Sequence, residues 1–279
     1  MKKLIPFLAA ALMTACGSTT ELNVMTFNVR YDNPEDGRNN WKFRKERVAE
    51  VIRDNRIDAF GTQEVLINQY NDLKGLLPEY ASVGVGREDG KEQGEFNAVF
   101  FRRDRFTLLD SGSFWLSETP EVAGSRGWDA ACERLATWAV LKEKGGTELL
   151  FINTHLDHMG RVARREGVTL LIERIGKLAA GRPVVLTGDF NAEPGSSVVG
   201  HVLACGIFND SKAVAATKAG PDWSFADYGS IPEAERPLID YIFVSKGVGV
   251  SHYEVLPDHN EEGFVSDHAP LKAAIHIEK

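Results

Sequence analysis

The chain has 279 residues, of which 43% are hydrophobic and 26% are charged, with a formal net charge of −8 and 3 cysteines. These values are those of an ordinary soluble protein with a sizeable core, and so few cysteines exclude a disulfide framework. The acidic balance disfavours a nucleic-acid partner, because such binders normally present a basic face, although total charge leaves a local basic patch open.

The first residues are typical of an export signal. Two lysines precede an apolar run, Leu4–Met13, that is too short to span a bilayer but fits the apolar region of a secretory signal. A small residue then precedes Cys16, an arrangement that resembles a bacterial lipoprotein signal. We therefore predict a signal peptide over residues 1–15, lipid attachment at Cys16 and a tether over residues 16–21. The protein would be exported and anchored to a membrane, in the periplasm or at the cell surface; an ordinary signal peptide that contains a cysteine is the alternative.

Residues 22–279 form one predicted domain, because no repeat or composition shift marks a boundary. Hydrophobic periodicity predicts strands interspersed with helices, and Asn40 is the expected N-cap of the first helix. In chain order these are strand Leu22–Phe27, helix Trp41–Arg53, strand Ile57–Thr62, helix Leu66–Leu77, strands Ala98–Arg102, Ala136–Leu141 and Leu149–Ile152, helix Val162–Leu178, and strands Val184–Thr187, Ile239–Val244, Val248–Val255 and Leu271–Ile277. This pattern favours an α/β or α+β sandwich, with sheets packed together and helices outside.

Six of these strands have polar side chains at their ends. The side chains are Asn28, Glu64, His155, Asp189, Asn191, Asp240, Asp267 and His268. The set is rich in oxygen, includes two imidazoles and lacks cysteine, which suits Mg²⁺ or Mn²⁺ and does not suit a structural zinc site. Carboxylates brought close together would repel one another unless a cation neutralised them. The sequence therefore predicts a divalent-metal site where strand ends meet.

Six motifs, taken in order, carry a family resemblance. They are VMTFNVR (24–30), GTQEV (61–65), NTHLDH (153–158), LTGDFNAEPGS (186–196), IDYIFVS (239–245) and SDHAPL (266–271). Together they resemble the endonuclease/exonuclease/phosphatase superfamily, and the resemblance covers essentially all of residues 22–279. It implies the α+β, DNase I-like fold, a four-layer α-β-β-α sandwich with two packed mixed β-sheets. Within the family, the chain is similar to bacterial members and is expected to be of the lipoprotein type.

The resemblance implies roles at the metal and at the water. Glu64 corresponds to the principal Mg²⁺-binding carboxylate, and Asn28 to the amide beside it. Asp267 corresponds to a group that supports the metal or the water. Asp189 corresponds to the residue that orients or deprotonates the attacking water, and Asn191 to its partner on the phosphate side, where it also binds substrate.

The resemblance further implies contacts to the phosphate. His268 corresponds to the histidine that contacts a phosphoryl oxygen, and Asp240 to the carboxylate that buttresses it. His155 corresponds to an additional phosphate-contacting histidine, and Arg134 stands where relatives bring a cationic or phenolic group to the substrate. Arg30 stands where the abasic-site nucleases carry an Asp, so a second metal carboxylate is not expected there.

Structural alternatives remain open for several of these residues. His155 could be a buried structural histidine, and Arg134 could pair with Glu133 or another surface acid. His158 could line the rim of a cleft or lie in a solvated loop. The segment Trp223–Phe225 could form a wall of the substrate site or serve only in packing.

These features predict a divalent-metal-dependent phosphohydrolase that cleaves a phosphomonoester or phosphodiester by attack of an activated water. We expect a monomer, a small-molecule or lipid phosphate ester as substrate, and membrane contact through the lipid anchor only. A metal-dependent nuclease on the same fold is the nearest alternative, and its basic run would be Arg161, Arg164 and Arg165. A non-catalytic, surface-anchored binding protein is the less favoured alternative.

Overall fold

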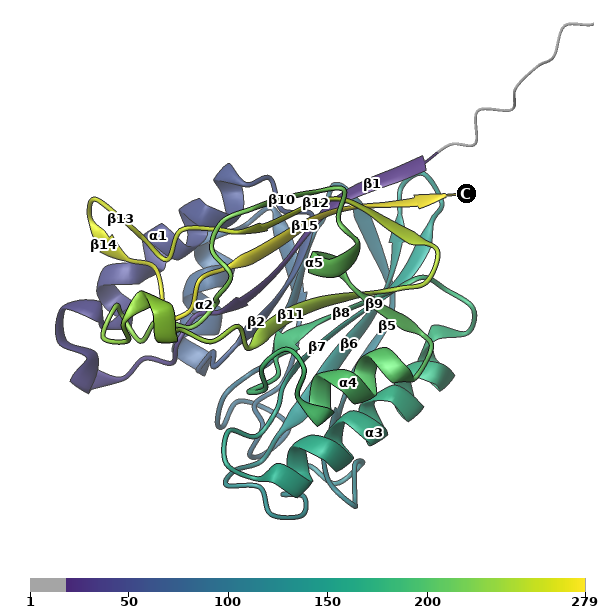
Figure 1. Cartoon of the computed structure of the whole chain (residues 1–279), viewed down its shortest axis with the longest axis horizontal. Helices are drawn as coiled ribbons and strands as arrows, with labels where there is room; N and C mark the ends of the chain where they lie inside the picture. Colours follow the sequence, from purple (N-terminus) through teal and green to yellow (C-terminus); the bar gives the residue numbers. More distant parts are fainter. Residues whose placement is uncertain (1–18, 279) are drawn as a thin grey trace, which may run out of the picture.

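The protein folds as two β-sheets packed against each other, with helices on their outer sides (Figure 1). The structure is a computed structural model that describes residues Thr19–Glu278, so the predicted signal peptide and Cys16 lie outside the described residues. No helix within this range has the length and apolar character needed to cross a bilayer. The expected sandwich of two packed mixed sheets is confirmed.

The first sheet has seven strands. In spatial order they are β10 (Thr217–Ala219), β12 (Val248–Val255), β15 (Leu271–Glu278), β1 (Thr19–Asn28), β2 (Ala59–Gln63), β4 (Val99–Arg102) and β3 (Tyr80–Val83). Strand β1 pairs antiparallel with β15 and parallel with β2. The start of β1 therefore lies beside the end of β15 (Figure 1), whereas β1 and β2 end together at the opposite edge, where Asn28 and Gln63 are paired.

The second sheet has six strands. In spatial order they are β5 (Phe106–Trp115), β6 (Leu135–Glu143), β7 (Glu148–His155), β8 (Val184–Asp189), β11 (Asp240–Ser245) and β9 (Phe208–Asp210). Strand β8 runs parallel to β7 and antiparallel to β11. The start of β11 therefore lies at the same edge as the ends of β7 and β8.

Helices cover both sheets. The first sheet carries α1 (Trp41–Asp54) and α2 (Ile67–Leu76), and the second carries α3 (Arg161–Ala179) and α4 (Ser197–Ala204) (Figure 1). Shorter segments are the helix α5 (Ser211–Val214), the 3-10 turns Pro34–Asn39 and Glu233–Glu235, and the hairpin of β13 (His259–Asn260) and β14 (Gly263–Phe264). Asn40 caps α1 as predicted, because its side chain accepts a hydrogen bond from the Lys42 backbone N–H.

Two clusters of buried apolar residues lie on opposite faces of the first sheet, and the one between the sheets also includes buried residues of α3 and α4. Along β1, Leu22 and Val24 pack between the two sheets, whereas Met25 and Phe27 pack beneath the helices. Successive side chains of a strand point to opposite faces, so a strand between two apolar layers needs apolar residues at both parities. The apolar residues of β1 accordingly occur at both parities along the strand.

Every predicted strand and helix is present, with boundaries that differ by three residues at most. One prediction is wrong: Thr19–Glu21, assigned to the tether, belong to β1 and pair with β15. The elements that were not predicted are β3, β5, β9, β10, β13, β14, α4 and α5, besides the two 3-10 turns. Strand β5 is an edge strand whose residues Leu108 and Leu109 are exposed, so it has no buried apolar run to find. Helix α4 is too short and too rich in valine to display helical periodicity.

Candidate active site

Three of the predicted residues form a row across the second sheet. His155 at the end of β7 pairs with Asp189 at the end of β8, and Asp189 pairs with Asp240 at the start of β11. Side chains in register on adjacent strands point to the same face, so the row directs an imidazole and two carboxylates toward one place. All three residues are buried, with 4%, 2% and 2% of their surfaces exposed.

The first sheet contributes Asn28 and Glu64 to the same place. Asn28 ends β1 and pairs with Gln63, and Glu64 follows directly. The Asn28 Nδ2 donates to Glu64 Oε1 at 3.0 Å and to Asp189 Oδ2 at 3.1 Å, which ties the two sheets together. Its amide oxygen accepts from the Arg30 backbone N–H at 3.0 Å. In this arrangement the Asn28 amide nitrogen holds the carboxylates in position. Its oxygen points away from them, whereas a metal ligand would turn its oxygen toward an ion held between them.

Backbone strain is concentrated at these residues. Arg30, Glu64 and Asn191 have φ values of 57°, 64° and 46°. These values lie in the left-handed region, which residues other than glycine rarely adopt. Such conformations cost free energy and persist only where surrounding contacts enforce them. Around Arg30, the carbonyl oxygen accepts from Gln69 Nε2 at 2.8 Å and the fully buried Arg44 side chain donates to neighbouring carbonyls. The loops of the site are therefore held by specific donors.

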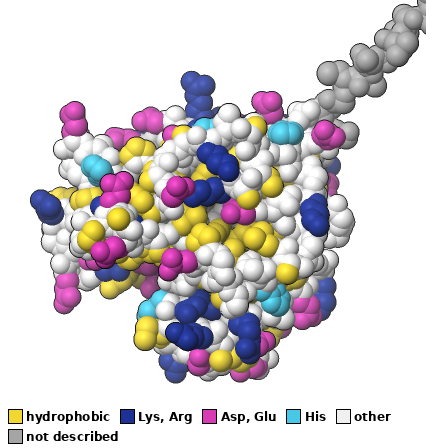
Figure 2. Space-filling view, viewed as in Figure 1, with side chains coloured by type: hydrophobic (Ala, Val, Ile, Leu, Met, Phe, Trp, Pro, Cys, Tyr) yellow, Lys and Arg dark blue, Asp and Glu magenta, His cyan; other side chains and the backbone are white. Residues whose placement is uncertain are grey.

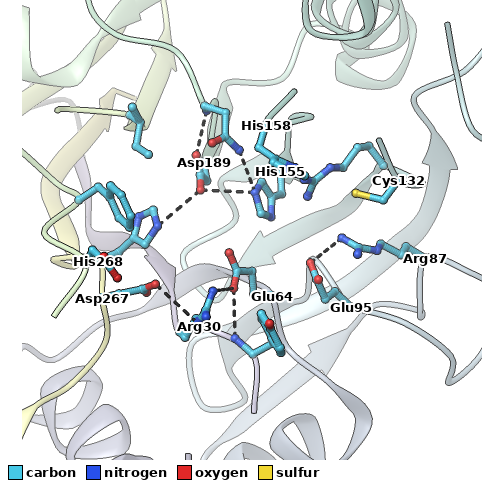
Figure 3. A pocket seen from close by; sticks show the side chains of 16 residues that line it. Arg30, Glu64, Arg87, Glu95, Cys132, His155, His158, Asp189, Asp267 and His268 are labelled. Carbon is cyan, nitrogen blue, oxygen red and sulfur yellow. Dashed lines mark hydrogen bonds and ion pairs between the residues drawn. The ribbon is translucent and has the colours of Figure 1, made fainter. Parts of the chain in front are cut away.

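A cavity of about 520 Å³ opens between these strand ends. Its lining includes seven of the residues selected from the sequence: Glu64, Arg134, His155, Asp189, Asn191, Asp267 and His268 (Figure 3). Asn28 and Asp240 are absent from its wall and lie buried behind it, where they contact the lining residues. The tertiary structure thus brings together every site residue predicted within the described chain.

The pair of His268 and Asp240 is the closest ionic contact among the predicted residues. His268 Nδ1 lies 2.8 Å from Asp240 Oδ2, which also accepts from Ser224 Oγ at 2.7 Å. Burial by itself lowers the pKa of His268, but the carboxylates of Asp240, Asp267 and Asp189 outweigh it and raise the pKa to about 10. His268 is therefore a cation at neutral pH, with Nε2 at 3.8 Å from Asp189 Oδ2.

Asp189 and His155 have the opposite electrostatic character. Burial, followed by the charge of Asp240, raises the pKa of Asp189 to about 7. Burial, followed by the guanidinium groups of Arg134 and Arg87, holds the pKa of His155 well below its usual range, so this imidazole is neutral. The His155 Nε2 lies 3.4 Å from Asp189 Oδ2 and 3.0 Å from the Asn191 side-chain amide.

Arg30 separates two carboxylates on the other wall. Its guanidinium lies 3.9 Å from Glu64 Oε2 and 3.7 Å from Asp267 Oδ2, and it pairs more closely with Asp36 at 3.2 Å. Burial is the main cause that raises the pKa of Asp267 to about 6, and Ser266 Oγ donates to its Oδ1 at 3.1 Å. The substitution of a carboxylate by Arg30, noted in the sequence, therefore places a fixed cation between two acids.

The donor set fits a divalent cation. One ligand atom each from Glu64, Asp189 and His268 lies within 4.8 Å of the others. Because Asp240 keeps His268 protonated, the available donors are carboxylate oxygens, with Asp267 also on the cavity wall. Oxygen donors crowded together are what Mg²⁺ and Mn²⁺ prefer. Of the residues predicted as metal ligands, Glu64 and Asp267 line the cavity. Asn28 lies beside Glu64 but presents its amide nitrogen, and not its oxygen, to the carboxylates.

The cavity extends to a second group of polar residues, most of which the sequence analysis missed. These residues are Arg87, Glu95, Cys132, Arg134 and His158, and they are called the far end below. Figure 3 shows that the labelled members lie beyond His155 and Glu64, away from His268 and Asp267. Arg134 does not pair with Glu133; its Nε lies 3.5 Å from the buried Asp157. Arg134 and His158 were singled out in the sequence, whereas Arg87 and Glu95 stand in a polar loop that has no distinguishing local pattern.

The aromatic wall was only partly anticipated. Of the segment Trp223–Phe225, Phe225 lines the cavity, and its ring centroid lies 4.7 Å from that of His268. Ser224 is buried and holds Asp240, whereas Trp223 stacks with Arg236 outside the cavity wall. The segment therefore contributes Phe225 to the cavity wall, whereas Ser224 and Trp223 serve in positioning and packing outside it.

Comparisons with known proteins identify a family and similar structures. Residues 25–268 match the model of the endonuclease/exonuclease/phosphatase family. The structure is similar to an endonuclease/exonuclease/phosphatase from Bacteroides vulgatus, with a TM-score of 0.91 and 43% identity over 93% of this chain and 100% of that one. It is also similar to a mannosyl-6-phosphatase from Bacteroides thetaiotaomicron, with a TM-score of 0.87 and 37% identity over 91% of this chain and 99% of that one.

A curated relative is more distant. The CCR4-Not complex 3'-5'-exoribonuclease subunit of Aspergillus niger is 22% identical over 313 residues, which cover 84% of this chain and 47% of that protein. The chain thus spans about half the length of this curated relative. The match to the family model covers most of the chain and includes every predicted active-site residue, from Asn28 to His268. The chain is accordingly a member of the endonuclease/exonuclease/phosphatase family.

Proposed function

We propose that this protein is a divalent-metal-dependent phosphohydrolase that cleaves small phosphate esters by attack of an activated water, with a sugar phosphate monoester as the favoured substrate. The observation that carries the proposal is the placement of Asp189, whose pKa is near 7, between the cationic His268 and the neutral His155. Similarity to a mannosyl-6-phosphatase supports the sugar phosphate.

Asp189 is the group that we assign to the attacking water. A carboxylate with a pKa near 7 can take a proton at neutral pH, and Asp189 lines the cavity. Asn28 donates to its Oδ2, and the backbone N–H of Asn191 donates to its Oδ1 at 2.9 Å. The water would pass its proton to Asp189 as its oxygen attacks phosphorus in line with the leaving oxygen.

The two histidines serve the phosphate in different ionisation states. Asp240 accepts at Nδ1 of His268, so the protonated ring turns Nε2 toward the cavity, where it can donate to a phosphoryl oxygen. The positive charge offsets the negative charge on the transferring phosphoryl group. Neutral His155 lies on the other side of Asp189 and can hydrogen-bond a phosphate oxygen without adding charge.

Glu64 and Asp267 would hold the divalent cation, with Asp189 next to them. A bound Mg²⁺ or Mn²⁺ ion supplies polarisation of a phosphate oxygen and neutralises charge in the transition state. Arg30 lies between Glu64 and Asp267, where relatives with a second carboxylate would add a ligand. Its fixed positive charge favours a site for a single cation.

A nuclease is the rival reading, because a curated relative is a 3'-5'-exoribonuclease subunit. Two members of the basic run noted in the sequence already have partners: Arg164 Nη1 donates to the Asp157 carbonyl, and Arg165 pairs with Glu166. On the face shown in Figure 2, acidic and basic side chains are interspersed, with one small basic group toward the bottom. A duplex binder needs several free cations along its cleft. A non-catalytic binding protein is disfavoured by the intact set of groups with strongly shifted pKa values.

We further propose that the protein is an exported monomer of the lipoprotein type, held to a membrane by a lipid on Cys16 alone. Cys16 precedes β1 by three residues, which reach about 10 Å at most. The active site lies at the opposite end of β1, whose ten residues span about 33 Å. This separation favours a soluble substrate over a lipid in the same membrane.

Removal of divalent cations is expected to abolish hydrolysis, because the carboxylates then repel both one another and the phosphate. Glu64→Gln should raise the Mg²⁺ concentration needed for half-maximal activity by roughly tenfold or more, as loss of a ligand or its support does. Activity is measured on a hexose 6-phosphate across a Mg²⁺ series after chelation. Glu50→Gln on the exposed face of α1 is the control and should keep the original requirement. Equal turnover with and without chelator would remove the metal from the mechanism.

Asp240→Asn is expected to lower the pKa of His268 from about 10, because the largest opposing charge is lost while burial still disfavours the imidazolium and only Asp267 and Asp189 continue to favour it. Since the folded-state pKa lies above the unfolded value of 6.5, the stabilisation from this pair is present below pH 6.5 and is lost as the pH rises toward 10. Titration of the imidazole protons of His268 by NMR in both proteins measures the shift. An unchanged His268 titration would contradict the assignment of Asp240.

Small esters and duplex DNA are expected to respond differently to salt. Hydrolysis of a hexose phosphate should change little between low and moderate salt, because its phosphate is bound at short range inside the cavity. Duplex binding would instead lose affinity by orders of magnitude over the same range. The rates on both substrates are measured in one salt series. Plasmid cleavage that is much the faster and collapses with salt would establish the nuclease.

Cys16→Ser is expected to move the protein from the membrane fraction to the soluble fraction of cells, because no other membrane attachment is proposed. Fractionation followed by immunoblotting measures the distribution. Cys205→Ser, a substitution inside the folded domain, is the control and should leave the protein with the membranes. Membrane association that survives Cys16→Ser would show that Cys16 is not the anchor.

A further inference from the structure

The far end of the cavity is built into the same frame as the catalytic residues. The backbone N–H of Arg87 donates to the Glu95 carbonyl at 3.1 Å, so the two residues sit on facing arms of one loop. Phe96, next to Glu95, pairs with Val65, next to Glu64. A shift of the loop would therefore disturb Glu64, and the far end is held at a constant place relative to the reacting groups.

The charges of the far end are balanced. Arg87 Nη1 lies 2.6 Å from Glu95 Oε2, and Arg134 pairs with the buried Asp157 at 3.5 Å. Burial, followed by the charge of Glu64, raises the pKa of Glu95 to about 7, while the guanidinium of Arg87 acts in the opposite direction. A subsite for a second phosphate would need an excess of positive charge. Arg87 and Arg134 do not provide this excess, because each is paired with a carboxylate.

Hydrogen-bonding capacity is nevertheless left over. Arg134 has only 5% of its side chain exposed, yet its Nη1 has no hydrogen-bond partner within residues 19–278, and the same is true of Arg87 Nε. A buried donor without a partner is costly, so such donors are expected to be satisfied by a ligand. The carboxylate of Glu95 lines the same space and accepts hydrogen bonds.

Donors and acceptors held side by side, without net charge, match hydroxyl groups. A hydroxyl donates to a carboxylate and accepts from a guanidinium, so neighbouring hydroxyls can satisfy both members of an ion pair. We infer that Arg87, Glu95 and Arg134 form a subsite that binds the uncharged, polyhydroxylated leaving group of the substrate. This inference rests on the proposed function. It adds that substrate specificity comes from hydrogen bonds to the hydroxyl groups of the leaving group, at the end of the cavity away from His268.

The test compares two primary-alcohol monophosphates, glucose 6-phosphate and n-hexyl phosphate, which differ in the hydroxyls that the subsite would contact. Glu95→Gln and Arg87→Met should each lower the ratio of kcat/KM for the sugar to kcat/KM for the alkyl ester by roughly 10- to 100-fold, the effect of losing one or two hydrogen bonds. Glu92→Gln, exposed on the same loop, should leave the ratio unchanged. A ratio that stays constant in both variants, with both rates falling together, would overturn the subsite.

Two measurements on the unaltered protein do not depend on the folding of variants. The wild type should prefer glucose 6-phosphate to n-hexyl phosphate by roughly tenfold or more, and equal kcat/KM values would overturn the inference. Fructose 1,6-bisphosphate should be no better a substrate than fructose 6-phosphate, and a clear preference for the bisphosphate would replace the hydroxyl subsite with an anionic one. If neither the sugar phosphates nor the alkyl ester is hydrolysed in the presence of Mg²⁺, the proposed function itself fails. Hydrolysis of both without preference refutes the subsite alone.

Discussion

Buried carboxylates at the seam between the two sheets impose the constraint on which the site depends. Glu64, Asp189, Asp240 and Asp267 converge there, and three of them are almost inaccessible to water. Such a cluster is stable only if each charge has a partner or is neutralised by a proton. His268 pairs with Asp240, and Arg30 lies between Glu64 and Asp267. Asn28 donates hydrogen bonds to both Glu64 and Asp189.

The same constraint separates the pKa values that catalysis requires. Asp240 is close enough to His268 to keep the imidazole charged, and its own charge makes ionisation of Asp189 harder. His155, beside the same carboxylate but facing Arg134 and Arg87, stays neutral. As a result, His268 is a cation, Asp189 is a proton acceptor and His155 is a neutral imidazole. Their differences arise from position and not from residue type.

Much of this arrangement could be predicted from the sequence. Apolar runs that stop at polar residues are a local pattern, so the strand ends carrying Asn28, Glu64, His155 and Asp189 were recognisable, and the order of the motifs indicated the family. Arg30, Arg87 and Glu95 could not be recognised in this way. An Arg or a Glu in a polar loop has the same local pattern whether it is solvated or turned into a cavity. Strand β5 was missed because its exposed face breaks the apolar run.

The sequence by itself determined most of the core strands, the polar residues that end them and the kind of ion that their oxygen atoms would suit. Only the tertiary structure decided which of those ends meet, because the pairing of β1 with β2 and of β8 with β7 and β11 joins separate segments of the chain. The packing of the two sheets then brings Asn28 to Asp189, which lies 161 positions away. It also decided that Asn28 turns its nitrogen to the carboxylates and that Arg134 pairs with Asp157 and not with Glu133. Orientation, burial and charge pairing depend on neighbours that come from distant segments, and local sequence carries no record of them.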